Sequence, residues 1–160
     1  MRFLEKPLVI GSISAVIAFL LDQVTKALMI ANAYVIGGGY PVFPGFNLVL
    51  WQNDGVSFGL LGGVPPWSLV ALALVVCAWI LILMLRTQDR IEALAYGLII
   101  GGAFGNILDR VRFGAVTDFL DFYVGAIHWP AFNFADAFLI SGVALIVLWS
   151  AIRNRRKAVK

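Results

Sequence analysis

The run NFADAFLISGVALIVLW, residues 133–149, is apolar over nearly its whole length, yet it carries a carboxylate, Asp136, near its start. A helix needs about 20 apolar residues to cross a hydrocarbon core of about 30 Å, so this run suits a membrane span. With Asn133 as the N-cap, Asp136 takes the third helical position, where the helix dipole stabilises a carboxylate. Asp136 is therefore either a helix cap or a group placed at the membrane edge for chemistry.

Composition indicates that the rest of the chain also belongs in a bilayer. Of its 160 residues, 61% are hydrophobic and 13% are charged, whereas a soluble domain is roughly half apolar and about a quarter charged. This composition excludes an ordinary water-soluble domain. We expect a single domain, residues 1–160, that is an all-α integral membrane protein with four transmembrane helices, at about residues 8–33, 66–85, 91–108 and 134–152.

Basic residues indicate the orientation of these helices. Arg2 and Lys6 precede the first helix, Arg86 and Arg90 join the second and third, and a basic tail, residues 153–160, follows the fourth. Four crossings put all three groups on one side, which the positive-inside rule makes cytoplasmic. Both termini are therefore expected in the cytoplasm. Anionic membrane lipids are the expected partners of the tail, and nucleic-acid binding is not needed to explain it.

The two connections on the opposite side, residues 34–65 and 109–133, have an extended character. The first lacks Lys and Arg and combines Gly and Pro with a β-leaning run, residues 46–51, and the turn signal NDG. The second contains VTDFLDFY and IHW, which also favour strands. We expect these outer loops to form a small extracytoplasmic β-rich region against the membrane surface.

Polar side chains of three predicted helices fall at one depth. At about 1.5 Å per residue, Asp22 lies roughly 21 Å above the cytoplasmic end of the first helix and Asn106 about 22 Å above that of the third. A charge at the membrane midplane costs roughly 2.5–3.5 kcal/mol, so intramembrane charges point to function. The polar layer comprises Asp22, Lys26, Asn106, Asp109, Arg110, Asn133 and Asp136.

Some of these charges also have a local explanation. Asp22 and Lys26 are spaced i,i+4 on one helix face, where they can neutralise each other. An ion pair between the neighbours Asp109 and Arg110 is the corresponding alternative for the third helix.

A pair of carboxylates is the candidate catalytic group. Asp118 lies in the loop before the fourth helix, at a depth similar to that of Asp136, and two such groups can share one proton so that one acts as base and the other as acid. Asp121 would face away from Asp118 in a strand but share its face in a helix, so spacing leaves Asp118–Asp121 as an alternative pair. This chemistry needs neither metal nor nucleophilic side chain. The single Cys77 and the single His128 lie in different regions, which excludes a Cys–His site.

The motifs of the chain resemble those of the lipoprotein signal peptidases, or signal peptidases II, of bacterial inner membranes. They occur in the family's order and cover nearly the whole chain, so that together they are specific. They are DQVTK at 22–26, NDGVSFG at 53–59, GGAFGNILDR at 101–110, VTDF at 116–119 and PAFNFADA at 130–137.

The resemblance implies an aspartic endopeptidase in which Asp118 and Asp136 form the catalytic dyad and Asp121 stands outside it. The implied substrate is a prolipoprotein that carries diacylglycerol on its lipobox cysteine and is cut on the amino side of that cysteine. The implied location is the bacterial inner membrane, with the site near the outer face. No metal or cofactor is implied, and we expect a monomer. Supporting positions around the dyad are Asp22, Lys26, Asn53, Gly55, Asn106, Asp109, Arg110 and Asn133.

Two positions depart from the family pattern. Asp54 stands where a small neutral residue is more usual and adds negative charge near the site, and Thr117 replaces an aliphatic residue. Neither position is a proposed catalytic group.

Two other classes of protein account for part of the pattern. The stretch GAVTDFLD, residues 114–121, resembles the metal-binding segment of CDP-alcohol-type head-group transferases, but the further acids of that motif are absent. A small proton or ion carrier would use the same Asp and Lys residues, although carriers place polar groups near the midplane. Dependence on a divalent metal separates the transferase from the protease.

Overall fold

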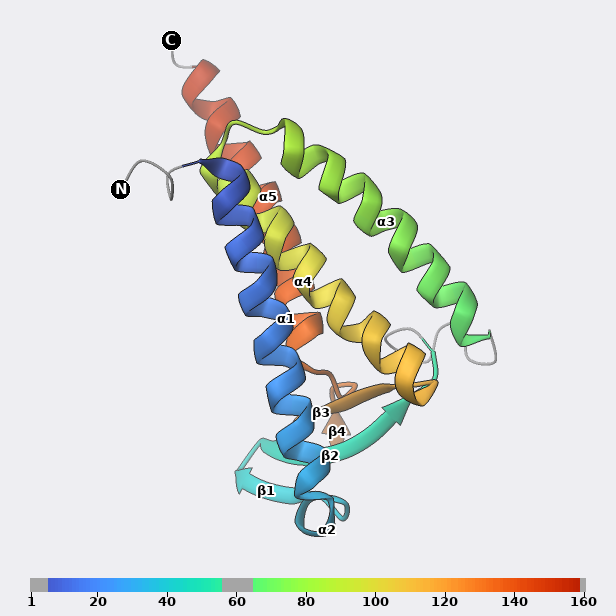
Figure 1. Ribbon diagram of the computed structural model, residues 1–160. Coiled ribbons are helices and arrows are strands. Elements are labelled where there is room, and N and C mark those ends of the chain that lie inside the picture. Colours follow the sequence, from blue (N-terminus) through green and yellow to red (C-terminus); the bar gives the residue numbers. More distant parts are fainter. Residues whose placement is uncertain (1–5, 56–64, 159–160) are drawn as a thin grey trace.

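The computed structural model describes residues 6–55 and 65–158, and most of this part of the chain is a bundle of long helices (Figure 1). Within it, four helices are long and apolar enough to cross a membrane, which confirms that prediction. They are α1 (Pro7–Ala31), α3 (Pro66–Arg86), α4 (Arg90–Phe113) and α5 (Phe134–Ala158).

Helix α4 packs closely against both α1 and α5 because it carries glycines where the helices meet. A Cβ atom at Gly97 would collide with the Ser14 hydroxyl and the Gly11 carbonyl oxygen of α1. A Cβ atom at Gly102 would lie 2.5 Å from the carbonyl oxygen of Ala135 in α5. Small residues of this kind let membrane helices approach backbone to backbone. Helix α3, by contrast, diverges from α4 toward one end of the bundle (Figure 1).

The ends of α4 explain why it extends beyond the predicted 91–108. Its N-cap is Asp89, whose carboxylate accepts hydrogen bonds from the backbone N–H groups of Ile91 (2.8 Å) and Glu92 (3.2 Å). Its C-cap is Gly114, which adopts a left-handed conformation with φ of 76°. No helix-breaking residue precedes Gly114 in the last turns, so Asp109 and Arg110 are helical and do not open the outer loop as predicted. Helix α1 ends at Ala31, two residues earlier than predicted, and a short helix α2 (Ala33–Ile36) follows.

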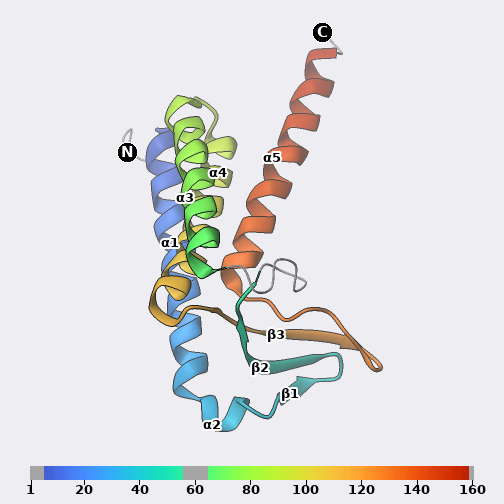
Figure 2. The same cartoon turned by 90° about the vertical axis from the view of Figure 1, so that its right-hand side faces the viewer.

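The predicted β-rich region is a four-stranded antiparallel sheet with strand order β1-β2-β3-β4. Its central pair joins the two predicted loops, since Trp51 of β2 lies opposite Asp118 of β3. The sheet lies at the end of the bundle away from both termini and projects sideways from it (Figure 2). The strands are β1 (Tyr40–Phe43), β2 (Phe46–Asn53), β3 (Val116–Val124) and β4 (Ile127–His128).

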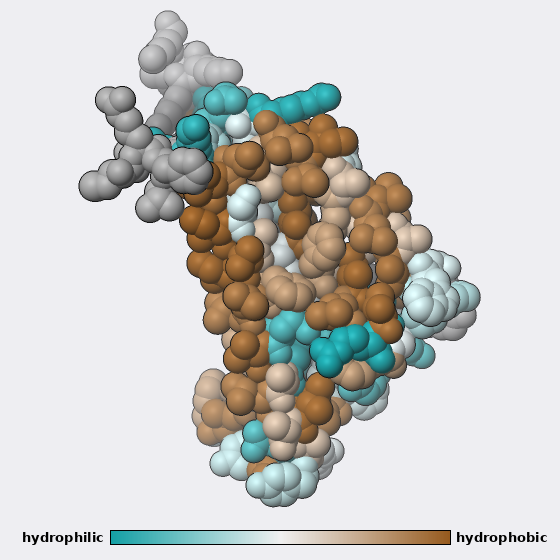
Figure 3. Space-filling view, in the orientation of Figure 1, coloured by the Kyte–Doolittle hydropathy of each residue, from teal (hydrophilic) through white to brown (hydrophobic). Residues whose placement is uncertain are grey.

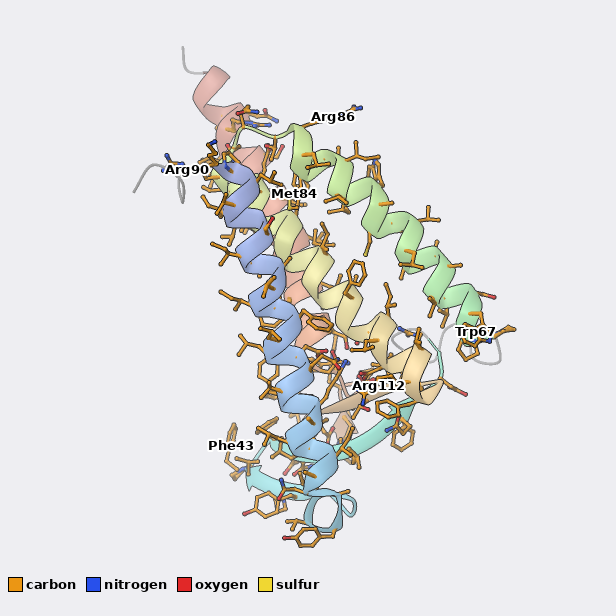
Figure 4. All side chains as sticks on the ribbon, in the orientation of Figure 1. Phe43, Trp67, Met84, Arg86, Arg90 and Arg112 are labelled. Carbon is orange, nitrogen blue, oxygen red and sulfur yellow. The ribbon has the colours of Figure 1, made fainter. Side chains whose placement is uncertain are left out.

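The surface of the molecule agrees with a multi-pass membrane protein. Apolar side chains cover most of the helical part in the view of Figure 3, and hydrophilic residues gather at the two ends of the bundle. Arg86 and Arg90 lie at the end that holds the termini, whereas Trp67 and Arg112 lie near the sheet (Figure 4). The charges that flank the helices are thus separated by the length of an apolar band.

The glycine contact between α1 and α4 gives a first prediction. Gly97→Ala should lower the free energy of unfolding by about 1–3 kcal/mol, because the added methyl group meets backbone that cannot move without displacing α1. Thermal unfolding of the purified protein in detergent measures this loss. Gly38→Ala is the matched control, since a Cβ atom there meets nothing within 4 Å. Equal unfolding temperatures for the two variants would contradict the close contact.

Candidate active site

The carboxylates of Asp118 and Asp136 line the same cleft. Asp118 comes from β3 and Asp136 from the first turn of α5. The cleft has a volume of about 270 Å³, and α3, α4 and α5 all contribute to it. Its remaining wall is largely apolar and includes Leu69, Leu72, Val76, Ile99, Ala103 and Leu139. A buried acid, Asp118, and a half-buried one, Asp136, thus stand at the edge of a cavity suited to apolar groups.

Two amide side chains hold the Asp118 carboxylate. The Nδ2 group of Asn133 donates a hydrogen bond to Oδ1 at 2.6 Å, and Nδ2 of Asn53 donates one to Oδ2 at 2.9 Å. Asn53 is itself oriented by a tight turn, in which the backbone N–H of Gly55 donates to its Oδ1 at 3.1 Å. Both amides therefore present their N–H groups to the acid, and the turn at residues 53–55 fixes one of them.

Asp136 is a helix cap and a member of the cleft at the same time. Its backbone N–H donates to Asn133 Oδ1 at 3.0 Å, and the Asn133 N–H donates to Asp136 Oδ2 at 3.3 Å. This reciprocal pair is a capping box at the start of α5. The other carboxylate oxygen, Oδ1, accepts a hydrogen bond from Asn106 Nδ2 at 2.9 Å. Asp136 can therefore be both a helix cap and a group that faces the cleft, because the two roles use different carboxylate oxygens.

Asn106 connects Asp136 to the buried charges around Lys26. Its Oδ1 accepts from Lys26 Nζ at 3.0 Å and from Asn133 Nδ2 at 3.2 Å, while its Nδ2 donates to Asp136. Lys26 fixes which way the amide points, since an ammonium group can only donate. The orientation of Asn106 in turn directs an N–H toward Asp136.

Lys26 lies buried between two carboxylates. Its Nζ is 2.9 Å from Asp22 Oδ2 and 3.1 Å from Asp109 Oδ2, so with Asn106 all three of its N–H donors have an acceptor. The other oxygen of Asp22 accepts the backbone N–H of Ala135 at 2.9 Å. The predicted Asp22–Lys26 pair is present, but it is one half of a cluster that ties α1 to α4 and to the start of α5.

The alternative pair of Asp109 with Arg110 is not the one that forms. Asp109 pairs with Lys26 and accepts the backbone N–H of Thr117 at 3.0 Å, so it faces the inside of the bundle. Arg110 instead donates from Nη2 to the carbonyl oxygen of Gly55 at 2.8 Å. Side chains of consecutive residues on a helix point about 100° apart, so Asp109 and Arg110 reach different partners. Arg110 thereby fastens the 53–55 turn to α4.

Burial raises the pKa of Asp118 to about 6 from its ordinary value of 3.8. The loss of hydration is the main cause, the hydrogen bond from Asn53 opposes it, and the negative charge of Asp136 adds to the rise. An acid with such a pKa holds a proton at a pH where an exposed aspartate is ionised. The pair can therefore contain one protonated and one ionised carboxyl group.

Asp121 has a separate set of partners on the sheet. It accepts from Asn47 Nδ2 at 3.0 Å, and its Oδ1 lies 2.8 Å from Nδ1 of His128. Asp118 and Asp121 are both on β3, which is a strand, and they share no hydrogen-bond partner among the described residues. The geometry thus groups Asp118 with Asp136 and leaves Asp121 in a structural pair with His128.

Sequence reasoning did not single out Gln23. Its Nε2 lies within hydrogen-bond distance of Asp22 Oδ2 (3.1 Å) and Asp109 Oδ1 (3.2 Å), and so adds a donor to the Lys26 cluster. Its position in DQVTK was the only available signal. Among the described residues, no group of three His, Cys, Asp or Glu side chains is arranged to hold a metal ion.

The fold and the site together define a multi-pass membrane protein with a pair of acids beside an apolar cleft. The model of the family described as Signal peptidase (SPase) II matches residues 14–152. The chain belongs to the signal peptidase II family, which makes it a member of a family of proteases.

Individual relatives agree with this assignment. A lipoprotein signal peptidase of Aeromonas hydrophila is 45% identical over 152 residues, which cover 89% of this chain and 88% of the relative. One of Syntrophus aciditrophicus is 36% identical, and the match covers 97% of this chain and 100% of the relative. A solved bacterial membrane enzyme is 30% identical and superposes with a TM-score of 0.82, covering 92% of this chain and 90% of the solved one.

The Lys26 cluster gives a second prediction. Lys26→Met should lower the free energy of unfolding by about 3–5 kcal/mol, because it leaves the buried Asp22 and Asp109 without their cation. Thermal or denaturant unfolding in detergent measures the loss. Val24→Ala, a truncation of a lipid-exposed side chain in the same helix, is the control and should cost far less. If both variants unfold alike, the cluster does not stabilise the bundle.

Proposed function

We propose that this protein is an aspartic endopeptidase that removes the signal peptide from diacylglyceryl-modified prolipoproteins. The observation that carries the proposal is the convergence of Asp118 and Asp136, from separate segments, on one apolar cleft. Membership of the signal peptidase II family supports the reaction, and the curated relatives are named lipoprotein signal peptidases. No metal or cofactor takes part in the proposed reaction.

In the proposed mechanism the two carboxyl groups share one proton. The ionised one takes a proton from a water molecule, whose oxygen attacks the carbonyl carbon of the scissile bond. The protonated one donates its proton to the carbonyl oxygen, which gives a neutral tetrahedral diol. As the C–N bond breaks, the protonated carboxyl group donates its proton to the leaving amine. The ionised one takes a proton from a diol hydroxyl, which gives the carboxyl product and restores a singly protonated pair. The raised pKa of Asp118 supports this mechanism, because it favours a singly protonated pair.

Asn106 and Asn133 keep the two acids in position during these steps. Each donates from Nδ2 to a different member of the dyad, at 2.9 Å to Asp136 and at 2.6 Å to Asp118. Because Lys26 and Asp22 lie behind them and not in the cleft, we assign those two residues a supporting role only. Gly55 and Arg110 support the dyad through the 53–55 turn in the same way.

The cleft suits a lipid-modified substrate. Its wall of leucine, valine, isoleucine and alanine side chains lies between membrane helices. Acyl chains and an apolar signal peptide are favourably buried against such a surface. Acyl chains held there would keep the peptide bond before the modified cysteine at the level of the dyad. Cleavage on the amino side of that cysteine follows from this placement.

We further propose that both termini are cytoplasmic and that the dyad works near the outer face of a bacterial inner membrane. Arg86 and Arg90 lie at the same end of the bundle as the termini, and the sheet lies at the other end (Figures 1 and 4). The positive-inside rule assigns the basic end to the cytoplasm. In this orientation the sheet is extracytoplasmic, and a monomer contains the whole site.

The dyad assignment gives the third prediction. Asp118→Asn and Asp136→Asn should each lower kcat by about 10²–10⁴-fold, because general acid–base catalysis contributes that much and an amide cannot exchange a proton in this range. Cleavage of a diacylglyceryl-modified prolipoprotein, followed by gel shift with a chelator present throughout, measures the loss.

Asp121→Asn is the matched control for this experiment. It removes a carboxylate of the same strand that pairs with His128, so the variant should still cleave the substrate. Normal cleavage by folded Asp136→Asn would show that this carboxylate is only a cap. Activity abolished by the chelator would favour the metal-dependent transferase class instead.

The pH dependence of the reaction gives the fourth prediction. One proton must remain on the dyad, so kcat/KM should fall as pH rises through the higher apparent pKa of the free enzyme. The hydrogen bond from Asn53 lowers the pKa of Asp118, which burial has raised to about 6. Asn53→Ala removes that bond, so the alkaline limb of kcat/KM should move to higher pH.

The control for the pH profile is Gln52→Ala. Gln52 is the neighbour of Asn53 in β2, but it donates to the hydroxyl of Thr117 and not to the dyad. Its alkaline limb should match that of the wild type. An alkaline limb that stays in place, or moves to lower pH, in Asn53→Ala would contradict the proposed role of the hydrogen bond.

A further inference from the structure

A second cavity lies beside the sheet and meets the apolar cleft at the dyad. It has a volume of about 700 Å³, and it shares Asn53 and Asp118 with the cleft. Trp51 and Trp129 contribute to its wall, and they are 65% and 60% exposed. Because Trp51 lies opposite Asp118 in the antiparallel pair of β2 and β3, the two side chains are on one face of the sheet. A substrate chain that crosses Asp118 therefore passes from the apolar cleft into a cavity that also carries the carboxylates of Asp54 and Asp121.

We propose that this second cavity binds a cationic side chain, lysine or arginine, of the first few substrate residues on the carboxyl side of the cleaved bond. The inference rests on the proposed function and adds a specificity determinant to it. If acyl chains and signal peptide occupy the apolar cleft, the segment that follows the modified cysteine has the second cavity as its continuation. The proposed occupant of the second cavity is thus the start of the mature chain.

The charge of the cavity wall favours a cation. Three aspartates line it, Asp54, Asp118 and Asp121, and no lysine or arginine does so among the described residues. Asp121 is occupied by Asn47 and His128, and Asp118 belongs to the dyad. Asp54 is exposed and has no hydrogen-bond or ion-pair partner within residues 6–55 and 65–158. It is therefore the carboxylate that can accept an ammonium or guanidinium group from the substrate.

The two indole rings add a second attraction for a cation. Lysine and arginine are drawn to the face of an aromatic ring, most strongly to tryptophan, within about 6 Å of its centroid. They also bury their aliphatic stems against such surfaces. An acidic side chain at the same substrate position would be repelled by the carboxylate of Asp54. The cavity should thus rank lysine above serine and serine above glutamate.

Three matched lipopeptide substrates test this ranking. They carry the same diacylglyceryl-modified cysteine and differ only in having lysine, serine or glutamate at the second and third positions after it. For the wild-type enzyme, kcat/KM for the lysine peptide should exceed that for the serine peptide by about fivefold, and the ratio should fall with added salt. The glutamate peptide should be the poorest of the three.

Two variants assign the effect to the cavity. Asp54→Asn keeps the shape of the side chain and removes its charge, so it should lower the lysine-to-serine ratio from about fivefold to below twofold, the remainder coming from the two indole rings. Asn32→Lys changes the net charge by the same amount at an exposed position outside the cavity, and it should leave the ratio as in the wild type. A ratio that survives in Asp54→Asn would overturn the role of this residue.

The outcomes also separate the inference from the proposed function. If the wild type cleaves the serine, lysine and glutamate peptides equally well, the specificity inference fails while the peptidase activity stands. If it cleaves none of them, the proposed function fails and the inference fails with it. A preference for lysine that is reduced only in Asp54→Asn supports both.

Discussion

The ammonium group of Lys26 is the point at which the packing of the bundle and the geometry of the site depend on each other. A buried cation is tolerated only when its charge and all its N–H donors are matched, and here Asp22, Asp109 and Asn106 match them. Because those partners lie on two helices, the cluster fixes the depth of α1 relative to α4. It also fixes the orientation of Asn106, and through it an N–H that reaches Asp136.

The proposed dyad is assembled from groups that also serve the local backbone. Asp136 caps α5 with one oxygen and faces the cleft with the other, and Asn133 takes part in the cap while it donates to Asp118. Because the same groups cap the helix and hold the two acids, the acids are kept in place without further charged residues at the site. It also means that the start of α5 cannot shift without moving both acids.

Two cavities that differ in the charged groups on their walls meet at Asp118. The cleft between the helices is mainly apolar, whereas the cavity beside the sheet carries three aspartates and two tryptophans. A substrate that carries acyl chains on one residue and polar residues beyond it would lie with its acyl chains in the cleft and its polar residues in the cavity beside the sheet. In the proposed peptidase, Asp118 at this junction, more than either cavity alone, would define the bond that is cut.

The four membrane helices and the presence of a small sheet could be predicted from the amino-acid sequence, because long apolar runs and alternating β-leaning segments are local signals. It also determined that Asp118 and Asp136 were candidates, but spacing could not choose between Asp136 and Asp121 as the partner of Asp118. Which charges pair depends on the packing of the helices: Asp109 pairs with Lys26, and Arg110 donates to the carbonyl oxygen of Gly55. These choices depend on the rotation and depth of helices packed through glycine contacts, which are set by residues far apart in the chain.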